Sequence, residues 1–295
     1  MNGVTPHALR PAKIRPYADI GPYKQLSVNY DEQQNAMWSF MQAEPRPCFT
    51  TALLREVEDF FSIVCNHDDS VAPIDYLVAA SGVQGIYNLG GDLNYFRQCI
   101  ESQDKERLRE YGYACLEMGY RCTTQFDRGV TTIALIQGQA MGGGLEAALS
   151  CNFIIAEESA TFGFPEVLFN LFPGMGAHVY LSRRVPAYVA QRMISSGNKY
   201  SAKEMYDMGI VDLLVKDGEG VTATTQFIKR HRSRLLAQRA ISTANLIVNP
   251  ISLQKLRDIN DIWVDTSMQI GPQELKTMER LIRAQGKIDN NSIEN

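Results

Sequence analysis

Two glutamates and three consecutive glycines stand close together in the middle of the chain, in the stretch QGQAMGGGLEAALSCNFIIAEESATFGFPE (137–166). An apolar run (130–136) precedes the glycines (142–144), a helix-like segment with Glu146 follows them, and a second apolar run leads towards Glu166. The start of a helix leaves backbone N–H groups without partners, and glycine lets a ligand approach them closely. We therefore predict a reaction centre that holds an anionic oxygen beside two carboxyl groups.

A second glycine turn, NLGGDL (88–93), lies upstream of MGGGLE (141–146). If the two turns lie side by side, each can donate one backbone N–H group to the same oxygen. Two such donors form an oxyanion hole, which stabilises a thioester enolate or a tetrahedral intermediate. Asp92 directly follows the first glycine pair, and we expect it to cap a helix rather than to take part in catalysis.

The composition is that of an ordinary globular protein of one large or two small domains. The chain has 295 residues, of which 45% are hydrophobic and 21% charged, and its net charge is −4. An acidic chain is a poor general binder of nucleic acids, and no apolar run approaches the length of a membrane span. The first residues, MNGVTPHALRPAKIRPY, have no apolar core, so we expect no secretory signal and a cytoplasmic location.

Cysteine and histidine spacing gives no sign of a metal centre. The six cysteines are scattered without a C-x-x-C pair, and the four histidines lie far apart in the sequence. We expect the cysteines to be reduced core residues. The sequence predicts no metal site and no cofactor.

Strand-like and helix-like segments alternate up to residue 215, and only helix-like segments follow. We expect, in chain order, a hairpin of strands 26–31 and 36–41, a helix 50–67, a strand 75–81, a glycine-rich loop leading to a helix near 92, and a helix 105–126. After the central stretch we expect helices 186–196 and 201–209, a strand 211–215, and helices 221–247, 252–270 and 273–286. This order predicts an α/β core (23–215) between an N-terminal arm (1–22) and a helical C-terminal region (216–295).

The order and spacing of the two glycine turns and the two glutamates resemble the crotonase (enoyl-CoA hydratase/isomerase) superfamily over roughly residues 24–287. The resemblance implies an α/β crotonase fold, a spiral of β-β-α units with a helical C-terminal layer. In this family that layer covers the acyl pocket and joins subunits, so it implies a homo-oligomer, a trimer or a hexamer.

Within the superfamily, four segments resemble the diffusible signal factor synthases of Gram-negative bacteria: NLGGDLNYF, IALIQGQAMGGGLEAALSCNFIIAEE, FGFPEVLFNLFPGMGA and IWVDTSMQIG. The resemblance implies a 3-hydroxyacyl thioester carried by acyl carrier protein. It implies dehydration to a cis-2-enoyl thioester and then hydrolysis to a free cis-2-unsaturated fatty acid, a quorum signal. Some of these synthases are held by a signalling regulator, which would be a further partner.

Carried over by position, the oxyanion donors are the N–H groups of Gly91 and Gly143, and the acid and base are Glu146 and Glu166. Glu146, near a helix start, should ionise more readily because the helix dipole favours an anion. Glu166, beside Pro165, should be desolvated and have a raised pKa. The sequence therefore favours Glu146 as base and Glu166 as acid, and it leaves the reverse order open.

The same comparison suggests which residues line the acyl pocket. They are Met141, Gly142, Met175, Trp263 and Leu281, for which a plain core role is about equally well supported. A basic cluster of the C-terminal region could dock an acidic carrier protein, although a solvated helix face is the simpler interpretation. It comprises Lys229, Arg230, Arg232, Arg234 and Arg239, with Arg183–Arg184 as a second candidate.

Two alternatives to signal synthesis remain open. The first is an enoyl-CoA hydratase or isomerase, with coenzyme A in place of the carrier protein. The second is a non-catalytic crotonase-like module that binds a regulator, which the presence of both glutamates and both glycine turns disfavours. Acyl chain length depends on pocket depth, which the sequence does not give.

Overall fold

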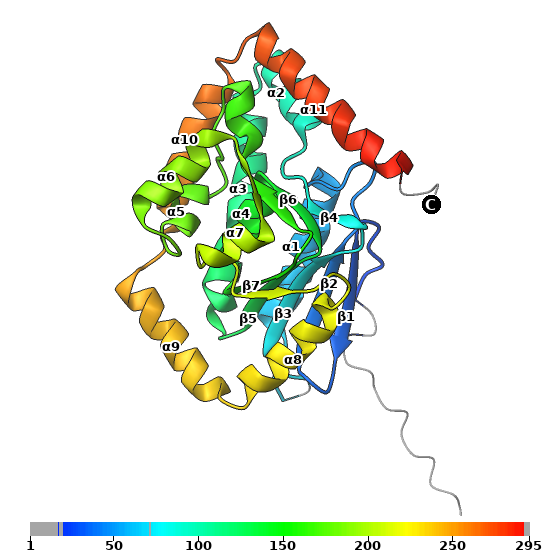
Figure 1. Ribbon diagram of the computed structural model, residues 1–295, viewed down its shortest axis with the longest axis vertical. Helices are drawn as coiled ribbons and strands as arrows, with labels where there is room; N and C mark the ends of the chain where they lie inside the picture. Colours follow the sequence, from blue (N-terminus) through cyan, green and yellow to red (C-terminus); the bar gives the residue numbers. More distant parts are fainter. Residues whose placement is uncertain (1–16, 18–19, 71, 292–295) are drawn as a thin grey trace, which may run out of the picture.

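Two β-sheets form the centre of the protein, whose computed structural model describes residues 17, 20–70 and 72–291, with side chains described to residue 283 (Figure 1). The larger sheet has the strand order β1(Leu26–Asp31), β2(Ala36–Met41), β3(Tyr76–Ser81), β5(Thr131–Ile136), β7(Phe153–Glu157), β10(Leu213–Val215). The smaller sheet has the order β4(Gly85–Asn88), β6(Gly138–Met141), β8(Thr161–Gly163), β9(Lys199–Ser201). All neighbours are parallel except the pairs β1–β2 and β8–β9.

The chain alternates between the two sheets in a repeating unit. Strands β3, β5 and β7 of the larger sheet are each followed by a strand of the smaller one, β4, β6 and β8. After β4 and β6 come the helices α2(Leu93–Glu101) and α4(Gly143–Ser150), and after β8 comes the 3-10 turn η2(Pro165–Phe169). This is the expected α/β crotonase fold of successive β-β-α units.

The smaller sheet is the main feature that the periodicity did not predict. Residues 85–88 were expected to belong to a glycine-rich loop, but they form β4, and the segment between β5 and the glycine turn forms β6. These strands are only three or four residues long. Runs this short are too brief to show alternation. Pairing with neighbouring strands therefore decides their conformation.

The expected hairpin and the first three helices are present, with their caps. Helix α1(Thr51–Asn66) begins after Thr50, whose side chain accepts a hydrogen bond from the Leu53 N–H. Asp92 caps α2, as predicted, and α3(Lys105–Thr123) follows. Further along come α5(Ala177–Leu181), α6(Ala187–Ser196) and α7(Ala202–Asp207), which starts with a capping box at Ser201.

The C-terminal region is helical, but the single helix expected at 221–247 is wrong. The chain forms α8(Gly220–Arg232) and α9(Leu235–Val248), separated by a break at which Arg234 has φ −130°. Helix α8 packs on the outer face of the larger sheet, where the Tyr76 hydroxyl and His231 Nδ1 are 3.0 Å apart. Helix α9 then turns away (Figure 1), and Leu235 and Arg239 in its first half still connect it to the larger sheet.

Two further helices, α10(Leu253–Ser267) and α11(Pro272–Asn291), lie at the other end of the molecule from α8 and α9 (Figure 1). Helix α10 packs against α3, and α11 packs against α2 and η2. On the inner face of the larger sheet, α1, α3 and α4 bury the main hydrophobic core. The site described below lies between this core and the α10–α11 end.

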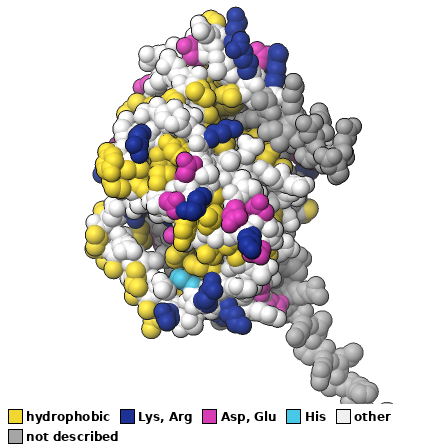
Figure 2. Space-filling model, viewed as in Figure 1, with side chains coloured by type: hydrophobic (Ala, Val, Ile, Leu, Met, Phe, Trp, Pro, Cys, Tyr) yellow, Lys and Arg dark blue, Asp and Glu magenta, His cyan; other side chains and the backbone are white. Residues whose placement is uncertain are grey.

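Helix α9 contributes no fully buried residue, and several of its large apolar side chains are exposed. Yellow side chains gather along that edge of the molecule in Figure 2. The exposed apolar residues of α9 include Leu236, Ile241, Ile247 and Val248, which are 87%, 53%, 77% and 83% exposed. Among the described residues, no helix combines the length and hydrophobicity needed to cross a bilayer. The predicted N-terminal arm lies almost wholly outside the described residues, and the predicted domain boundaries stay predictions.

A buried carboxylate fastens α9 to the larger sheet. Asp75, which is 7% exposed, accepts hydrogen bonds of 2.8 Å from Asn35 Nδ2 and from Arg239, and Arg232 Nε lies 3.8 Å away. Two arginines of the predicted docking cluster therefore hold the C-terminal helices in place. Hydrogen bonds to a charged group contribute about 1.5–3 kcal/mol each, more than those between neutral groups.

We expect Asp75→Asn to lower the free energy of unfolding by about 1.5–3 kcal/mol, because the amide removes the charge that the arginine faces. The measurement is urea unfolding followed by circular dichroism. The matched control is Asp207→Asn, which breaks an exposed pair with Lys203 and should cost less than about 1 kcal/mol. Equal losses in the two variants would contradict this role for Asp75.

Candidate active site

The two glycine turns touch each other through their backbones. The first turn follows β4, the second follows β6, and Gly90 and Gly142 adopt the positive φ values of 94° and 53°. A Cβ atom placed on Gly90 would lie 2.9 Å from the Gly143 nitrogen and from the Met141 oxygen. A Cβ on Gly143 would lie 3.4 Å from the Gly91 nitrogen. At Gly90 only glycine permits this approach, whereas the distance at Gly143 is an ordinary van der Waals contact.

Two backbone N–H groups at this contact have no partner. In the part of the chain that the structure describes, neither Gly91 nor Gly143 donates a hydrogen bond, whereas the residue before each of them does. The Gly90 N–H donates to Asn88 Oδ1 at 2.8 Å, and the Gly142 N–H donates to the Gly163 oxygen at 2.8 Å. Both free groups line one pocket. They can hold one oxygen between them, as the sequence predicted.

A tyrosine that belongs to no sequence motif holds the first turn in place. The Tyr111 hydroxyl, on α3, donates to the Phe49 oxygen and accepts the Asp92 N–H at 3.2 Å. The Asp92 carboxylate caps α2 and pairs with Arg46 at 2.9 Å. The hydrogen bond to Phe49 joins residues that are 62 positions apart in the sequence, so no local sequence pattern predicts it.

Glu146 lies in the first turn of α4 and is 2% exposed. Its Oε1 accepts hydrogen bonds from the N–H groups of Met175 at 2.8 Å and Ala177 at 2.9 Å. Burial raises the pKa of Glu146 to about 7, against the opposing effect of these two bonds. Desolvation therefore outweighs the helix dipole, and the pKa of Glu146 lies above that of an exposed glutamate.

Glu166 lies in η2, and its carboxyl group faces the second glycine turn. A Cβ on Gly142 would lie 2.5 Å from Glu166 Oε1, so the glycine makes room for this carboxyl group. Its Oε2 is buried and has no hydrogen-bond partner among the described residues. Burial, with repulsion from Glu146, raises the pKa of Glu166 to about 8. The raised pKa expected for Glu166 is thus present, and Glu146 is the stronger acid of the pair.

One pocket of about 200 Å³ brings together the residues that the sequence predicted for catalysis and acyl binding. Both glutamates and both N–H donors line it, as do the five predicted acyl-pocket residues, Met141, Gly142, Met175, Trp263 and Leu281. The pocket also contains Gln139, Lys199 and Phe96, to which the sequence reasoning assigned no role.

The C-terminal helix α10 fixes the loop that supplies one hydrogen bond to Glu146. The Trp263 ring lies so close to Gly174 that a Cβ there would be 2.3 Å from its Cγ. Asn260, fully buried, donates from Nδ2 to the Gly174 oxygen at 3.1 Å. This positions Met175, whose N–H binds Glu146. Asn260 was not predicted, since a lone asparagine in a helix looks like a surface residue.

The basic residues considered for carrier docking lie elsewhere. The cluster is on α8 and α9, at the end of the molecule opposite to α10 and α11 (Figure 1). Arg184 pairs with Asp212 at 3.1 Å and donates to the Cys151 oxygen at 2.8 Å, so it supports the local fold. Carrier docking on these residues stays a prediction.

A family model described as enoyl-CoA hydratase/isomerase matches residues 46–248, more than half of the chain. The chain is 27% identical over 242 residues to "Probable enoyl-CoA hydratase 2, mitochondrial" of Arabidopsis thaliana, which covers 80% of this chain and 71% of that protein. It is 31% identical over 211 residues to "Enoyl-CoA hydratase domain-containing protein 2, mitochondrial" of Bos taurus, covering 70% and 66%.

Solved structures share the fold. The enoyl-CoA hydratase of Bacillus halodurans superimposes with a TM-score of 0.74 at 17% identity, over 86% of this chain and 98% of that one. Pseudomonas aeruginosa DspI superimposes with a TM-score of 0.56 at 23% identity, over 90% and 98%. At these identities the likeness establishes the fold alone.

Because the pKa of Glu166 is raised, the ionised carboxyl group destabilises the folded protein. The folded protein holds this proton up to a pH of about 8, whereas the unfolded chain releases it near 4.5, so the carboxyl group lowers stability increasingly as the pH rises between these values. We expect the stabilising effect of Glu166→Gln to be at least ~1.4 kcal/mol larger at pH 9 than at pH 5.

Urea unfolding of both proteins at the two pH values measures this difference. The matched control is Glu158→Gln, at an exposed position outside the pocket, which should show no such dependence. A Glu166→Gln effect that is the same at both pH values would show that the folded environment does not hold the proton.

Proposed function

This chain belongs to the enoyl-CoA hydratase/isomerase family, and on that premise we propose that it adds or removes water at the α and β carbons of an acyl-CoA thioester. The observation that carries the proposal is the meeting of two free N–H groups and two buried carboxyl groups in one pocket. The two N–H groups can bind the thioester oxygen, and the two carboxyl groups can transfer protons at the α and β carbons.

The N–H groups of Gly91 and Gly143 bind the thioester oxygen. When the α proton leaves, negative charge develops on this oxygen, and the two donors stabilise it without rearranging. One such donor typically contributes about 2.7–4 kcal/mol to the transition state. The site is fixed because both N–H groups belong to backbones that pack against each other.

Glu146 and Glu166 exchange protons with the substrate in opposite senses. In dehydration, ionised Glu146 takes the α proton, the C–H electron pair forms the double bond, and protonated Glu166 gives its proton to the departing 3-hydroxyl, which leaves as water. Hydration is the reverse. The two N–H bonds to Glu146 favour its anion, whereas the unpartnered Oε2 of Glu166 is available to a hydroxyl or a water.

Coenzyme A is the thiol carrier that the comparisons support, because the relatives named above are enoyl-CoA hydratases. A second candidate is the signal synthase that acts on acyl carrier protein, supported by the four segments that resemble such enzymes. Its hydrolytic step would use the same oxygen site, with a glutamate activating water. In that candidate a signalling regulator is a further partner. Independently of the substrate, we propose that the exposed apolar face of α9 forms the contact of a homo-oligomer.

The test gives the purified protein 3-hydroxyacyl thioesters of coenzyme A and of acyl carrier protein and follows thioester and free acid by mass spectrometry. We expect reversible dehydration of the CoA thioester without release of free acid. Glu146→Ala and Glu166→Ala should each lower kcat by about 10²–10⁴-fold. Glu158→Ala, which removes an exposed glutamate, should keep the wild-type rate.

The outcomes separate the candidates. A free cis-2-unsaturated acid formed from the carrier-protein thioester alone would establish signal synthesis in place of the CoA reaction. If neither thioester is converted and the Glu146→Ala/Glu166→Ala double variant still signals fully in cells, the protein acts as a non-catalytic regulatory module.

A further inference from the structure

One backbone peptide unit joins helix α10 to the carboxyl group of Glu146. The carbonyl oxygen of Gly174 and the N–H of Met175 belong to the same planar trans peptide, so they point in opposite directions. The oxygen accepts a hydrogen bond from Asn260 Nδ2 at 3.1 Å, and the N–H donates to Glu146 Oε1 at 2.8 Å. The amide of Asn260 and the carboxyl group of Glu146 therefore bind opposite sides of one rigid group.

The loop that contains this peptide has no regular structure of its own. Residues 171–176 form neither a helix nor a strand, and α5 begins only at Ala177. Among the described residues, Asn260 is the only hydrogen-bond donor to the Gly174 oxygen. Trp263, one turn further along α10, also packs on the peptide, because a Cβ on Gly174 would lie 2.3 Å from its Cγ. Both contacts thus come from one face of α10.

The contact between Asn260 and α3 is not one that stability would select. Asn260 is fully buried, and its Oδ1 has no hydrogen-bond partner in the part of the chain that the structure describes. A buried polar atom without a partner lowers stability. The facing residue is Gly112, where a Cβ would lie 2.4 Å from the amide, and glycine is unfavourable in the interior of a helix. An apolar side chain opposite an alanine would pack this contact better, so the amide needs another explanation.

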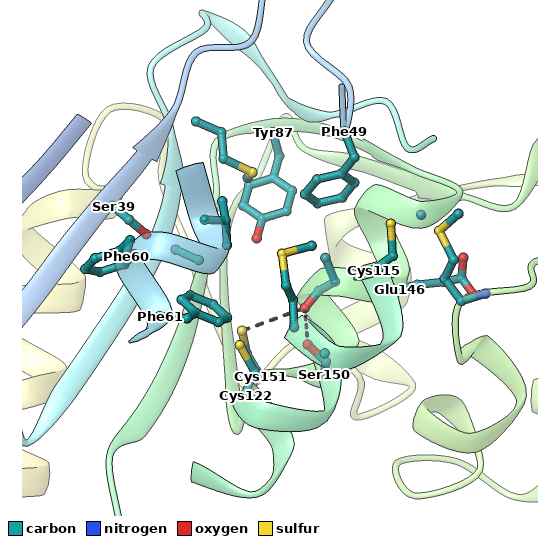
Figure 3. A pocket seen from close by; sticks show the side chains of 18 of the residues that line it. Ser39, Phe49, Phe60, Phe61, Tyr87, Cys115, Cys122, Glu146, Ser150 and Cys151 are labelled. Atoms are coloured by element: carbon teal, nitrogen blue, oxygen red, sulfur yellow. Dashed lines mark hydrogen bonds between the residues drawn. The ribbon is translucent and has the colours of Figure 1, made fainter. Parts of the chain in front are cut away.

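The other surroundings of Glu146 disfavour a negative charge. It borders both the catalytic pocket and an apolar space of about 70 Å³ in the main core (Figure 3). The titratable side chains that line these spaces from neighbouring elements are, with one exception, acids: Glu166 on η2, Tyr87 on β4, Cys115 and Cys122 on α3, Cys151 after α4, and Tyr180 on α5. The exception is Lys199 on β9, which is exposed, so water and salt screen its charge. The N–H groups of Met175 and Ala177 are therefore the contacts that favour ionised Glu146.

We propose that Asn260 is a positioning residue that prepares Glu146 to act as a base. Its amide orients the Gly174–Met175 peptide so that the N–H meets the carboxylate. A hydrogen bond received by the carbonyl group also polarises the peptide and strengthens the bond that its N–H donates. Asn260 does not line the catalytic pocket, so it acts through the peptide alone. The proposal rests on the proposed function, in which ionised Glu146 takes the α proton.

The test measures kcat/KM against pH for dehydration of a 3-hydroxyacyl-CoA thioester by the wild type and by Asn260→Leu, whose side chain has a similar shape but no donor. The acidic side of this profile reports the pKa of Glu146, which burial raises to about 7. Without the anchored N–H the carboxylate is less favoured, so we expect the acidic side to move to higher pH by about 0.5–1 pH unit. At pH 6 this is a loss of about three- to tenfold beyond any loss at the optimum.

Asn260→Ala removes the same donor but leaves a hole that the leucine of Asn260→Leu fills. The two variants should therefore differ in stability, measured by urea unfolding, and agree in the shift of the acidic side. A merely structural role of Asn260 gives another pattern, in which the rate falls at every pH in proportion to the lost stability and the acidic side stays at its wild-type position. That pattern would overturn the proposal.

Two controls separate the amide from its surroundings. Leu256→Ala weakens the packing of α10 one turn before Asn260 without removing the donor, because Leu256 is fully buried. Asn66→Leu removes an exposed amide of α1 whose Nδ2 donates to the backbone oxygen of Ser62 at 2.8 Å. Both variants should keep the acidic side at its wild-type position. If Leu256→Ala moves it as far as Asn260→Leu does, the packing of α10 sets it and the proposal is wrong.

The failure of the proposed function gives a different result, namely no turnover of either thioester by the wild type at any pH. In that event carbon-13 NMR of protein labelled at the glutamate carboxyl groups tests the positioning role by itself, with the Glu146 signal identified by its absence in Glu146→Gln. A titration midpoint that Asn260→Leu raises by at least ~0.5 pH unit supports the role without the reaction. Equal midpoints in the wild type and Asn260→Leu would overturn it.

Discussion

The close approach of two backbones, at Gly90 and Gly143, is the constraint on which the rest of the site depends. A single methyl group at Gly90 would meet backbone atoms at 2.9 Å and separate the turns. The two sheets make the contact possible, because β4 and β6 are neighbours in the smaller sheet and deliver their turns at the same edge. Hydrogen bonds satisfy the adjacent N–H groups and leave those of Gly91 and Gly143 free.

The two carboxyl groups show how burial and hydrogen bonding compete. Both lie where water is scarce, so both hold their protons to a higher pH than an exposed glutamate does. Glu146 receives two N–H groups and Glu166 Oε2 receives none, which separates them in the order that a base and an acid require. The two glutamates thus differ in environment, which suits Glu146 to act as a base and Glu166 to act as an acid.

The sequence could predict the parts of this site that depend on residue type and spacing. The glycine runs, Glu146 and Glu166 are visible in the chain, and a family resemblance supplied Trp263 and Leu281. The short strands β4 and β6 could not be predicted, because tertiary pairing rather than periodicity forms them. Nor could Tyr111 and Asn260, whose contacts join segments far apart in the chain. The direction of the Glu146 pKa shift also required burial, which a sequence pattern does not give.

Glu146 lies where water is scarce on two sides, because it lines both the catalytic pocket and an apolar space of the main core. Electrostatic interactions strengthen as water leaves, so the hydrogen bonds from Met175 and Ala177 act over a lower dielectric than they would at the surface. The same burial raises the pKa of the carboxyl group, and the two N–H groups oppose that rise. The loop that supplies these N–H groups therefore favours the ionised form of Glu146 at a place where burial alone would hold its proton.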